Sequence, residues 1–329
     1  MITKCLYVIG ISASNFKFLI YLWLENQEKY RLKIKRVGKE ITENFEVSPI
    51  SIEDFLLIDK DRNIENIYDK NNISFAVIDS LKSTAYLRVK AFQDVGYTFD
   101  FLLGAVPIPD FENKLKNIFK DLKKDNVQNL ILDFRGNLGG SIGLANSILS
   151  YLIPNQFVSA QLSIREAGLN KLPASHDLLS PNLAKRFKNK VDEDFIEYNY
   201  SNFRVAPKEG LVFKGNIYVL INGGTFSAAS YFASKLYDSS IGTFIGVPAG
   251  GAYTGASGGF FSTLKLPNTN LTINLPLMRV LFNVNSKKYP ETHLKPDFEV
   301  PLSFDGFLKK QDTAMRFTAE LIKNGKKAR

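Results

Sequence analysis

Apolar and polar residues follow two different periods along the chain, and these periods predict where strands and helices lie. In residues 31–58 the segments RLKIKRV and ENFEVSPI alternate with a period of two, so we expect two short strands there. Residues 60–73 are polar and are interpreted as a loop or linker. Further along, apolar residues recur at helical spacing and predict an amphipathic helix whose buried face consists of Phe111, Leu115, Ile118, Phe119 and Leu122.

Two later blocks share one order: an apolar strand, a glycine-rich turn and a helix. NLILDF is a continuous apolar run, typical of a strand buried on both faces of a parallel sheet, and RGNLGG and a helix follow it. The order returns in GNIYVLINGGTFSAASYFASKLY. Residues 243–276 predict a strand, a glycine loop and a hairpin. Alternating strands and helices of this kind indicate an α/β fold.

Two other stretches complete the organisation of the chain. Residues 160–210 are polar, and we expect them to form a mostly helical excursion outside the core. Near the end, KKQDTAMRFTAELIKNG predicts a C-terminal helix.

Composition excludes several classes of protein. The 45% hydrophobic and 12% aromatic fractions are those of a globular protein. The net charge is +9, but the basic residues are spread out with no accompanying nucleic-acid-binding motif, so we expect no nucleic acid partner. Cys5 is the single cysteine and the two histidines lack zinc-site spacing, which argues against a metal enzyme. Neither glycine turn matches a nucleotide-binding pattern, so no cofactor is expected.

The start of the chain weakly resembles an export signal. A lysine, a short apolar run and small residues occur in order, but Lys17 interrupts the apolar stretch. We therefore interpret residues 1–24 as a buried strand followed by a helix, and predict no integral membrane span. The compartment stays open at this point.

The two glycine turns carry the candidate chemistry. Glycines at such corners permit close backbone approach, and the N–H groups at a helix N-terminus are free to donate to an anion or an oxyanion. Ser227 stands at the second corner, where a nucleophile would be exposed. Serine is also a preferred helix N-cap, so this position by itself fits either role.

Five segments in order resemble the tail-specific, or C-terminal-processing, serine peptidases, a family that includes the tricorn protease core. They are LILDFRGNLGG, GNIYVLINGGTFSAAS, IGVPAGGA, LPNTNLTI and KPDFEVPL, and the resemblance covers roughly residues 75–305. It implies a ClpP/crotonase-like fold with a repeated β-β-α core and a small β-rich N-terminal segment. Peptide or protein substrates and usual export from the cell are implied as well.

The resemblance also assigns roles residue by residue. Ser227 stands at the nucleophile, and the N–H of Ala228 would form an oxyanion hole with that of Gly139 or Gly140. Gly250 and Gly251 match a glycine loop beside the substrate cleft.

Domain boundaries follow from the same resemblance. Residues 1–30 would be the remnant of a PDZ-like domain, and residues 31–73 a β-rich connecting segment and linker. Residues 74–305 would form the catalytic domain, and residues 306–329 a C-terminal helix. In this interpretation the chain is short at its N-terminus, and its oligomeric state stays open.

In the general base, this chain differs from both branches of the family. One branch places a lysine in the loop after the nucleophile, where this chain has Ala252. Lys235 lies eight residues along the helix, about 12 Å of axial rise away, and is disfavoured as a base. The tricorn-like branch, whose Pro-x-Gly-Gly loop is matched by PAGG, takes a histidine from a segment before the PDZ domain, and this chain begins after that point. We therefore expect an upstream segment carrying a histidine to restore or raise activity.

Other residues are weighed as partners of Ser227. The tricorn-like branch has an assisting Glu before the final Pro-Asp, and Glu291 stands one residue from that position. His176 and His293 are weak alternatives for the base, and His293 is better explained as a strand-end residue. Asp133 and Arg135 are interpreted as a buried pair that fixes the first corner.

Three functions are therefore open. The first is a serine endopeptidase that forms an acyl-enzyme at Ser227. The second is an inactive or truncated homologue that binds peptides as an added strand without cleaving them. The third, more remote, is a crotonase-type enzyme that acts on acyl-CoA.

Overall fold

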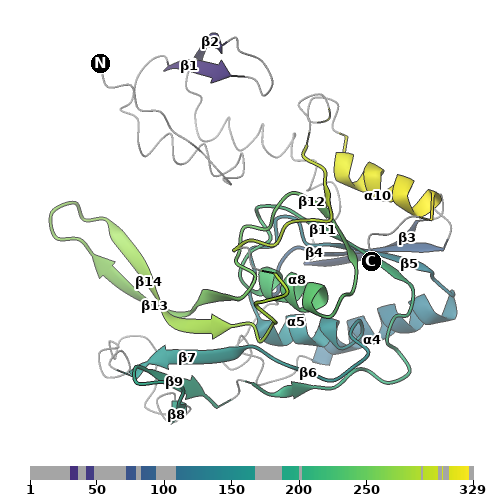
Figure 1. Cartoon of the computed structure of the whole chain (residues 1–329), viewed down its shortest axis with the longest axis horizontal. Helices are drawn as coiled ribbons and strands as arrows, with labels where there is room; N and C mark the ends of the chain where they lie inside the picture. Colours follow the sequence, from purple (N-terminus) through teal and green to yellow (C-terminus); the bar gives the residue numbers. More distant parts are fainter. Residues whose placement is uncertain are drawn as a thin grey trace. The chain divides into compact units, whose positions relative to one another are not determined.

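The computed structural model describes residues 30–35, 42–47, 72–78, 83–93, 109–166, 187–199, 202–289, 292–302, 306 and 311–325. The chain divides into two units (Figure 1). The first consists of Met1–Tyr68 with Phe304–Gln311, and the second of Asp69–Ser303 with Asp312–Arg329. The two units are described separately below.

The first unit contains one antiparallel pair of strands. β1 (Tyr30–Lys35) pairs with β2 (Thr42–Val47). These are the two strands that the alternating pattern of residues 31–58 predicts. The PDZ-like remnant expected over residues 1–30 falls, apart from Tyr30, outside the described residues.

The second unit is built on a six-stranded sheet. In spatial order its strands are β15 (Phe298–Glu299), β12 (Thr243–Gly246), β11 (Asn216–Ile221), β5 (Asn129–Asp133), β4 (Thr84–Val89) and β3 (Ile73–Ile78). Neighbouring strands from β15 to β4 are parallel, and β3 pairs antiparallel with β4 at the edge. Because β5 and β11 are adjacent and parallel, the turns that follow them emerge at the same edge of the sheet.

Apolar residues on successive positions explain why the central strands are buried on both faces. In β5, Leu130 and Leu132 belong to one hydrophobic cluster, whereas Ile131 between them belongs to the other. β11 repeats this division, with Val219 in the first cluster and Leu220 in the second. A continuous apolar run is what a parallel strand covered on both sides requires.

Helices cover the two faces of this sheet (Figure 1). α4 (Pro109–Lys124), α5 (Ile142–Leu149) and α8 (Ala228–Asp238) contribute to the larger cluster on one face. α10 (Thr313–Lys323) packs on the other face through Ala314 and Leu321. The second unit is therefore a mixed α/β structure with helices on both sides of its main sheet.

The amphipathic helix predicted from the sequence is α4. The five residues of its predicted buried face are all at most 6% exposed: Phe111, Leu115, Ile118, Phe119 and Leu122. The predicted C-terminal helix is α10, which begins at Thr313 after the N-cap Asp312.

A second, antiparallel sheet corrects the expectation for residues 160–210. Its order is β13 (Gly255–Lys265), β14 (Thr272–Leu281), β7 (Gln161–Arg165), β9 (Phe195–Tyr198) and β8 (Phe187–Lys190). β6 (Phe157–Val158) pairs separately with β10 (Arg204–Val205). The described residues of this stretch are thus mainly strands, and the prediction of a mostly helical excursion is wrong for them.

The reason for this error is a long-range pairing. Arg279 on β14 lies opposite Ser163 on β7, forms a 2.9 Å ion pair with Asp192, and stacks 3.8 Å over the ring of Phe195. Tertiary partners of this kind override the local preference of a polar segment.

The described part of the chain was also searched for membrane spans. None of its helices combines the length and the apolar character that crossing a bilayer requires.

Candidate active site

Ser227 lies at the turn between β11 and α8, in an unusual backbone conformation. Its φ is 53° and its ψ is −120°. Residues other than glycine rarely adopt positive φ, and holding one there costs of order 1–3 kcal/mol. A serine on a strained strand-to-helix turn presents its hydroxyl outward from the sheet edge. Ser227 itself is partly buried.

The Ser227 side chain does not cap the helix it precedes. It forms no hydrogen bond to the first N–H groups of α8. Capping is the ordinary structural use of a serine at this position. The cap interpretation of Ser227 therefore lacks the contact on which it depends.

The first glycine corner lies directly against Ser227. A Cβ added to Gly139 would stand 2.6 Å from the Ser227 Cβ and 2.9 Å from the Ala228 nitrogen. Gly139 also has a φ of 108°, which favours glycine. The structure thus brings Gly139 against Ser227 and Ala228, although it lies far from them in the sequence.

Hydrogen bonds tie the two corners to each other. The Phe226 N–H donates to the Asn137 carbonyl at 3.0 Å. The Asn222 Oδ1 accepts from the Gly136 and Gly224 N–H groups, both at 2.9 Å. Sequence reasoning missed Asn222, although an Asn before a glycine pair is a signal for a side chain that bonds its own turn.

Thr225 is the buried centre of the second corner. Its Oγ1 accepts from the Asn222 N–H at 3.1 Å and donates to the Phe134 carbonyl at 3.0 Å. Its side chain therefore connects the end of β11 to the residue after β5. Sequence reasoning did not single out this residue.

The Thr225 carbonyl holds a third segment in place. It accepts from the N–H groups of Gly250 and Gly251 at 3.1 and 3.2 Å, and from the Ser230 hydroxyl at 3.0 Å. A Cβ on Gly251 would lie 2.1 Å from the Ser230 Oγ, so the loop is pressed onto the helix. A Cβ on Gly250 would likewise lie 2.1 Å from the Gly223 carbonyl oxygen. The predicted glycine loop thus adjoins the Ser227 turn.

Among the described residues, the backbone N–H groups of Ala228 and Gly140 at this junction have no acceptor. The Gly139 N–H donates to the Asn137 Oδ1 at 2.9 Å instead. Ala228 is the first residue of α8, where the helix dipole adds a partial positive charge. An anionic oxygen placed here would find donors that are not otherwise engaged.

Asp133 and Arg135 form a structural ion network, as the sequence predicts. Arg135 makes 2.7 Å contacts with Asp133 and with Asp312, the N-cap of α10. Burial by itself raises the pKa of Asp133, but the Arg135 charge and hydrogen bonds outweigh it and hold this pKa below its ordinary value. Tyr86 donates a further 2.7 Å hydrogen bond to the carboxylate.

The structure describes only some of the residues considered as a base or an assisting acid for Ser227. His293 is exposed, and its backbone bridges that of Ala252 in the loop that adjoins the site. His176 and Glu291 lie outside the described residues. Lys235 is buried and donates to the Asn283 carbonyl at 3.0 Å, and this burial lowers its pKa.

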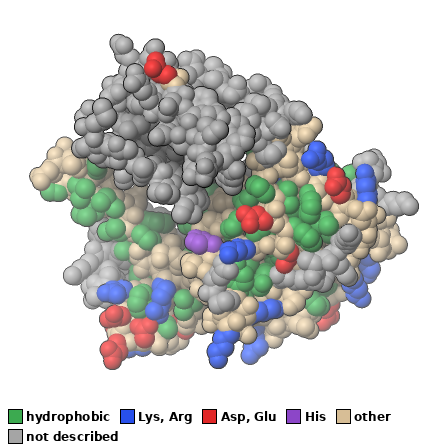
Figure 2. Space-filling view, turned by 45° about the horizontal axis from the view of Figure 1, so that its top comes forward, with side chains coloured by type: hydrophobic (Ala, Val, Ile, Leu, Met, Phe, Trp, Pro, Cys, Tyr) green, Lys and Arg blue, Asp and Glu red, His purple; other side chains and the backbone are tan. Residues whose placement is uncertain are grey.

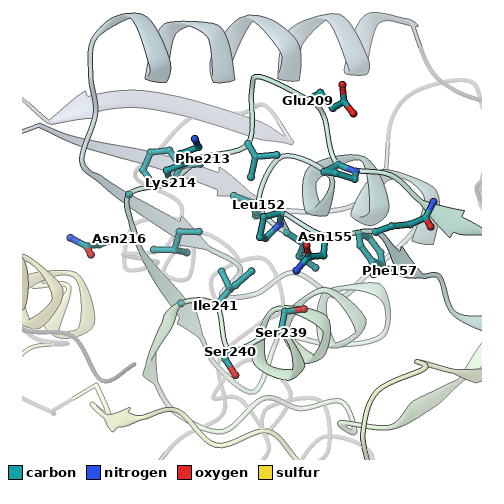
Figure 3. Close-up of a pocket in the computed structure, with 18 of the residues that line it drawn as sticks. Leu152, Asn155, Phe157, Glu209, Phe213, Lys214, Asn216, Ser239, Ser240 and Ile241 are labelled. Carbon is teal, nitrogen blue, oxygen red and sulfur yellow. The ribbon is translucent and has the colours of Figure 1, made fainter.

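A pocket of about 890 Å³ lies at the other end of β11 (Figure 3). Asn216 and Thr243, at the starts of β11 and β12, contribute to its wall, together with Leu152 and Phe157. Ser227 follows the far end of β11, so this pocket is separate from the candidate site. Among the described residues, no three His, Cys, Asp or Glu side chains are grouped so that they could hold a metal ion.

Comparison with known protein families shows to which family the chain belongs. The model of peptidase family S41 matches residues 83–300. The chain belongs to peptidase family S41. Membership of this family supports a serine peptidase in general.

Solved structures agree on the fold. Mature CPAF in complex with lactacystin is 16% identical, covers 91% of this chain and 68% of its own, and gives a TM-score of 0.53. A candidate peptidase from Parabacteroides merdae is 19% identical, covers 80% of this chain and 68% of its own, and gives 0.51. No curated protein sequence matches the chain.

Proposed function

We propose that this S41 chain is a serine endopeptidase of the tail-specific kind, with Ser227 as its nucleophile. The observation that carries the proposal is the backbone of Ser227, which is held at positive φ without a capping bond. The strained backbone of this turn is not compensated by a capping hydrogen bond. Such a turn fits a serine whose hydroxyl is exposed for reaction.

The reaction begins at the Ser227 hydroxyl. Its oxygen attacks the carbonyl carbon of a peptide bond while a base takes its proton. The tetrahedral intermediate then expels the amine, which leaves with a proton, and an acyl-enzyme ester remains on the serine. Water attacks this ester, releases the carboxylic acid and restores the hydroxyl.

The oxyanion of the intermediate is assigned to the backbone of the two corners. The Ala228 N–H is one donor, and Gly140 is favoured over Gly139 as the second because the Gly139 N–H already donates to Asn137. Removing one such donor typically costs about 2.7–4 kcal/mol of transition-state stabilisation.

The loop at Gly250 and Gly251 is assigned to the substrate cleft. Residues without side chains let an extended peptide approach the backbone closely. The Thr225 carbonyl fixes this loop against the Ser227 turn, which supports a cleft whose wall and nucleophile keep one geometry.

The alternatives are less well supported. The family match favours neither a crotonase-type acyl-CoA enzyme nor a homologue that only binds peptides. The peptidase and the binding protein differ in one property, which is whether Ser227 is activated. An activated serine reacts covalently with an electrophile such as a fluorophosphonate.

The test is the intact mass of the folded chain after incubation with a fluorophosphonate. We expect one adduct on the wild-type chain and none on Ser227→Ala. Ser141→Ala is the matched control, because Ser141 is the N-cap of α5 at the other corner, and this variant should label normally. Absence of labelling in a folded wild-type sample would contradict the proposal.

The base is sought with the same assay. His176→Ala and His293→Ala separate the two histidines of the chain, and Glu291→Gln tests the assisting acid. Loss of labelling on one change identifies that residue as a partner of Ser227. If labelling is unchanged in all three, we expect a chain extended upstream by a histidine-bearing segment to label faster.

A further inference from the structure

The exposed side of α4 carries a row of lysines with no acidic residue among them. Lys116, Lys120 and Lys124 follow one another at intervals of four residues, and Lys123 lies three residues after Lys120. Residues three and four apart are neighbours on a helix surface, so the four side chains form one strip along the helix. All four residues are exposed. We call them the α4 lysine strip.

The strip is directed largely away from the hydrophobic core. Ile118 and Leu122 belong to the buried face of α4, and each is at most 6% exposed. Successive residues of a helix are about 100° apart around its axis, which places Lys120 and Lys124 on the side away from these two residues. The lysines therefore lie along the outward side of the helix.

Within the part of the chain that the structure describes, no carboxylate neutralises the strip. Lys116, Lys120 and Lys124 form neither an ion pair nor a side-chain hydrogen bond there. The Lys123 ammonium donates to the Gly210 carbonyl at 2.9 Å, and this neutral partner leaves its charge uncompensated. The strip thus presents four positive charges to its surroundings.

Two acidic residues of α4 border the strip without pairing with it. Glu112 lies four residues before Lys116, but its carboxylate pairs with Lys208 at 3.5 Å instead. Asp121 lies three residues before Lys124, and no ion pair joins the two side chains. The helix therefore leaves its lysines unpaired although acids stand at pairing distance along the sequence.

Helix electrostatics explain only part of this arrangement. Lys123 and Lys124 stand in the last turn of α4, where a positive charge complements the helix dipole. Lys116 and Lys120 lie before that turn, and like charges four residues apart destabilise a helix. The strip consequently costs the helix some stability, and an external anion would offset this repulsion.

α10 shows the arrangement that an ordinary solvent-facing helix has. Its exposed positions include Arg316, Glu320 and Lys323, so that charges of opposite sign follow one another. On the face of the molecule seen in Figure 2, Lys and Arg side chains are likewise interspersed with Asp and Glu. The α4 lysine strip lacks this alternation and is a local concentration of positive charge.

We propose that the α4 lysine strip docks the protein on the negatively charged headgroups of a lipid surface. Four or more basic residues on an amphipathic helix are attracted to anionic lipids. The apolar side of α4 is occupied by the core, so this attachment uses charge alone and is reversible by salt. The inference stands apart from the proposed chemistry at Ser227.

A nucleic acid fits the strip less well. The strip contains lysine and no arginine, whereas arginine is the residue that binds phosphates with paired hydrogen bonds. It also has no aromatic side chain on which a base could stack. From Lys116 to Lys124 it extends about 12 Å along a straight helix, and the outward line of a helix meets a flat surface along its whole length.

The test measures how much of the full chain floats with vesicles on a density gradient. We expect the wild type to bind vesicles that contain phosphatidylserine and not vesicles of phosphatidylcholine alone. Raising the salt from about 0.1 M to about 1 M should release it, because the screening length falls from about 10 Å to about 3 Å.

A double variant locates the binding surface. Lys116→Gln combined with Lys120→Gln should weaken binding about 25-fold, since each lysine near an anionic surface contributes about fivefold. Lys265→Gln combined with Lys287→Gln is the matched control. It removes the same charge from the end of β13 and the loop after β14, and should leave the affinity within about twofold of the wild type.

Circular dichroism checks that each variant is folded, and Lys120→Gln with Lys124→Gln replaces the first pair if that variant unfolds. A wild type that does not bind phosphatidylserine vesicles at low salt overturns the proposal. Equal losses in the strip variant and the control overturn it too, because net charge alone would then explain the binding. A wild type that binds duplex DNA more tightly than these vesicles, and loses this binding in the strip variant, would assign the strip to nucleic acid instead.

Discussion

The two glycine corners of the main sheet place a serine at the same point and use it differently. Ser141 precedes α5 and Ser227 precedes α8, and each follows a buried parallel strand and a pair of glycines. Ser141 has a φ of −74° and its hydroxyl accepts from the Leu144 N–H at 3.3 Å. Ser227 has a φ of 53° and forms no such bond.

The contrast teaches that a serine at a helix start is not by itself a candidate nucleophile. Ser141 is fully buried and has the extended backbone of an ordinary N-cap. Ser227 is partly exposed and lies beside unengaged N–H groups. What separates them is the backbone conformation and the neighbours, because the residue type and its place in the motif are shared.

The largest expected effect concerns the charges that fix the first corner. Arg135→Met would leave the buried Asp133 carboxylate without its guanidinium, which typically costs about 3–5 kcal/mol of folding free energy at neutral pH. Urea unfolding measures this loss. The exposed pair of Arg165 and Asp194 is the control, and Arg165→Met should cost less than about 1 kcal/mol.

The pH dependence of this variant has a definite sign. In the wild type the pKa of Asp133 lies below its ordinary 3.8, so the stability from this group is complete above that pH and is lost as pH falls through the lower value. Without Arg135 this pKa should rise, because burial is then opposed only by the Arg88 charge and the Tyr86 hydrogen bond. The deficit of the variant should therefore shrink as pH falls and the carboxyl becomes protonated. A deficit that does not change with pH would contradict this account.

The next largest effect is expected from adding a side chain at Gly139, where the two corners touch. Gly139→Ala adds a Cβ that would lie 2.6 Å from the Ser227 Cβ, at a φ of 108° that alanine adopts poorly. We expect fluorophosphonate labelling to slow by at least about a hundredfold, because Ser227 and the adjacent Ala228 N–H must shift. Gly258→Ala is the control, since its Cβ would meet no atom within 4 Å. Equal labelling rates in the two variants would show that the close approach of Gly139 to Ser227 does not affect labelling.

A smaller loss should follow from removing the Thr225 hydroxyl. Thr225→Val keeps the shape but leaves the Asn222 N–H and the Phe134 carbonyl without this partner, at a cost of about 1–3 kcal/mol. Thr263→Val, on the exposed hairpin, should change the free energy of unfolding by less than about 0.5 kcal/mol. Denaturant titration compares them, and similar losses would mean that Thr225 is no special connection.

The smallest expected effect is the difference in stability between the alanine variants of Ser141 and Ser227. Ser141→Ala should lower the free energy of unfolding by about 1 kcal/mol, because it deletes a capping bond. Ser227→Ala should lower it by less than this, since no cap is lost. Thermal unfolding of both variants gives the comparison, and a larger loss at Ser227 would show that its side chain supports the fold.

The sequence predicted the elements whose pattern is local. The buried face of α4, the two-sided burial of β5 and the paired charges of Asp133 and Arg135 follow from spacing and residue type, and the structure confirms them. The resemblance also selected Ser227 and Gly139, which the structure places in contact. Their chemical roles are the proposal that labelling will test.

The strands between residues 160 and 210 could not be predicted. Their order depends on the pairing of Arg279 with Asp192 and Phe195, in segments far apart along the chain. The roles of Thr225 and Asn222 were hidden for the same reason, because their partners lie on three separate turns.

The sequence by itself therefore determined the α/β order, the helix faces and the family, since these depend on residue type and short-range period. The tertiary structure alone decided which glycine faces which serine, and that one serine caps its helix while the other stands uncapped at positive φ. The physical reason is that backbone strain and close approach depend on contacts across the sheet edge. No local pattern records such contacts.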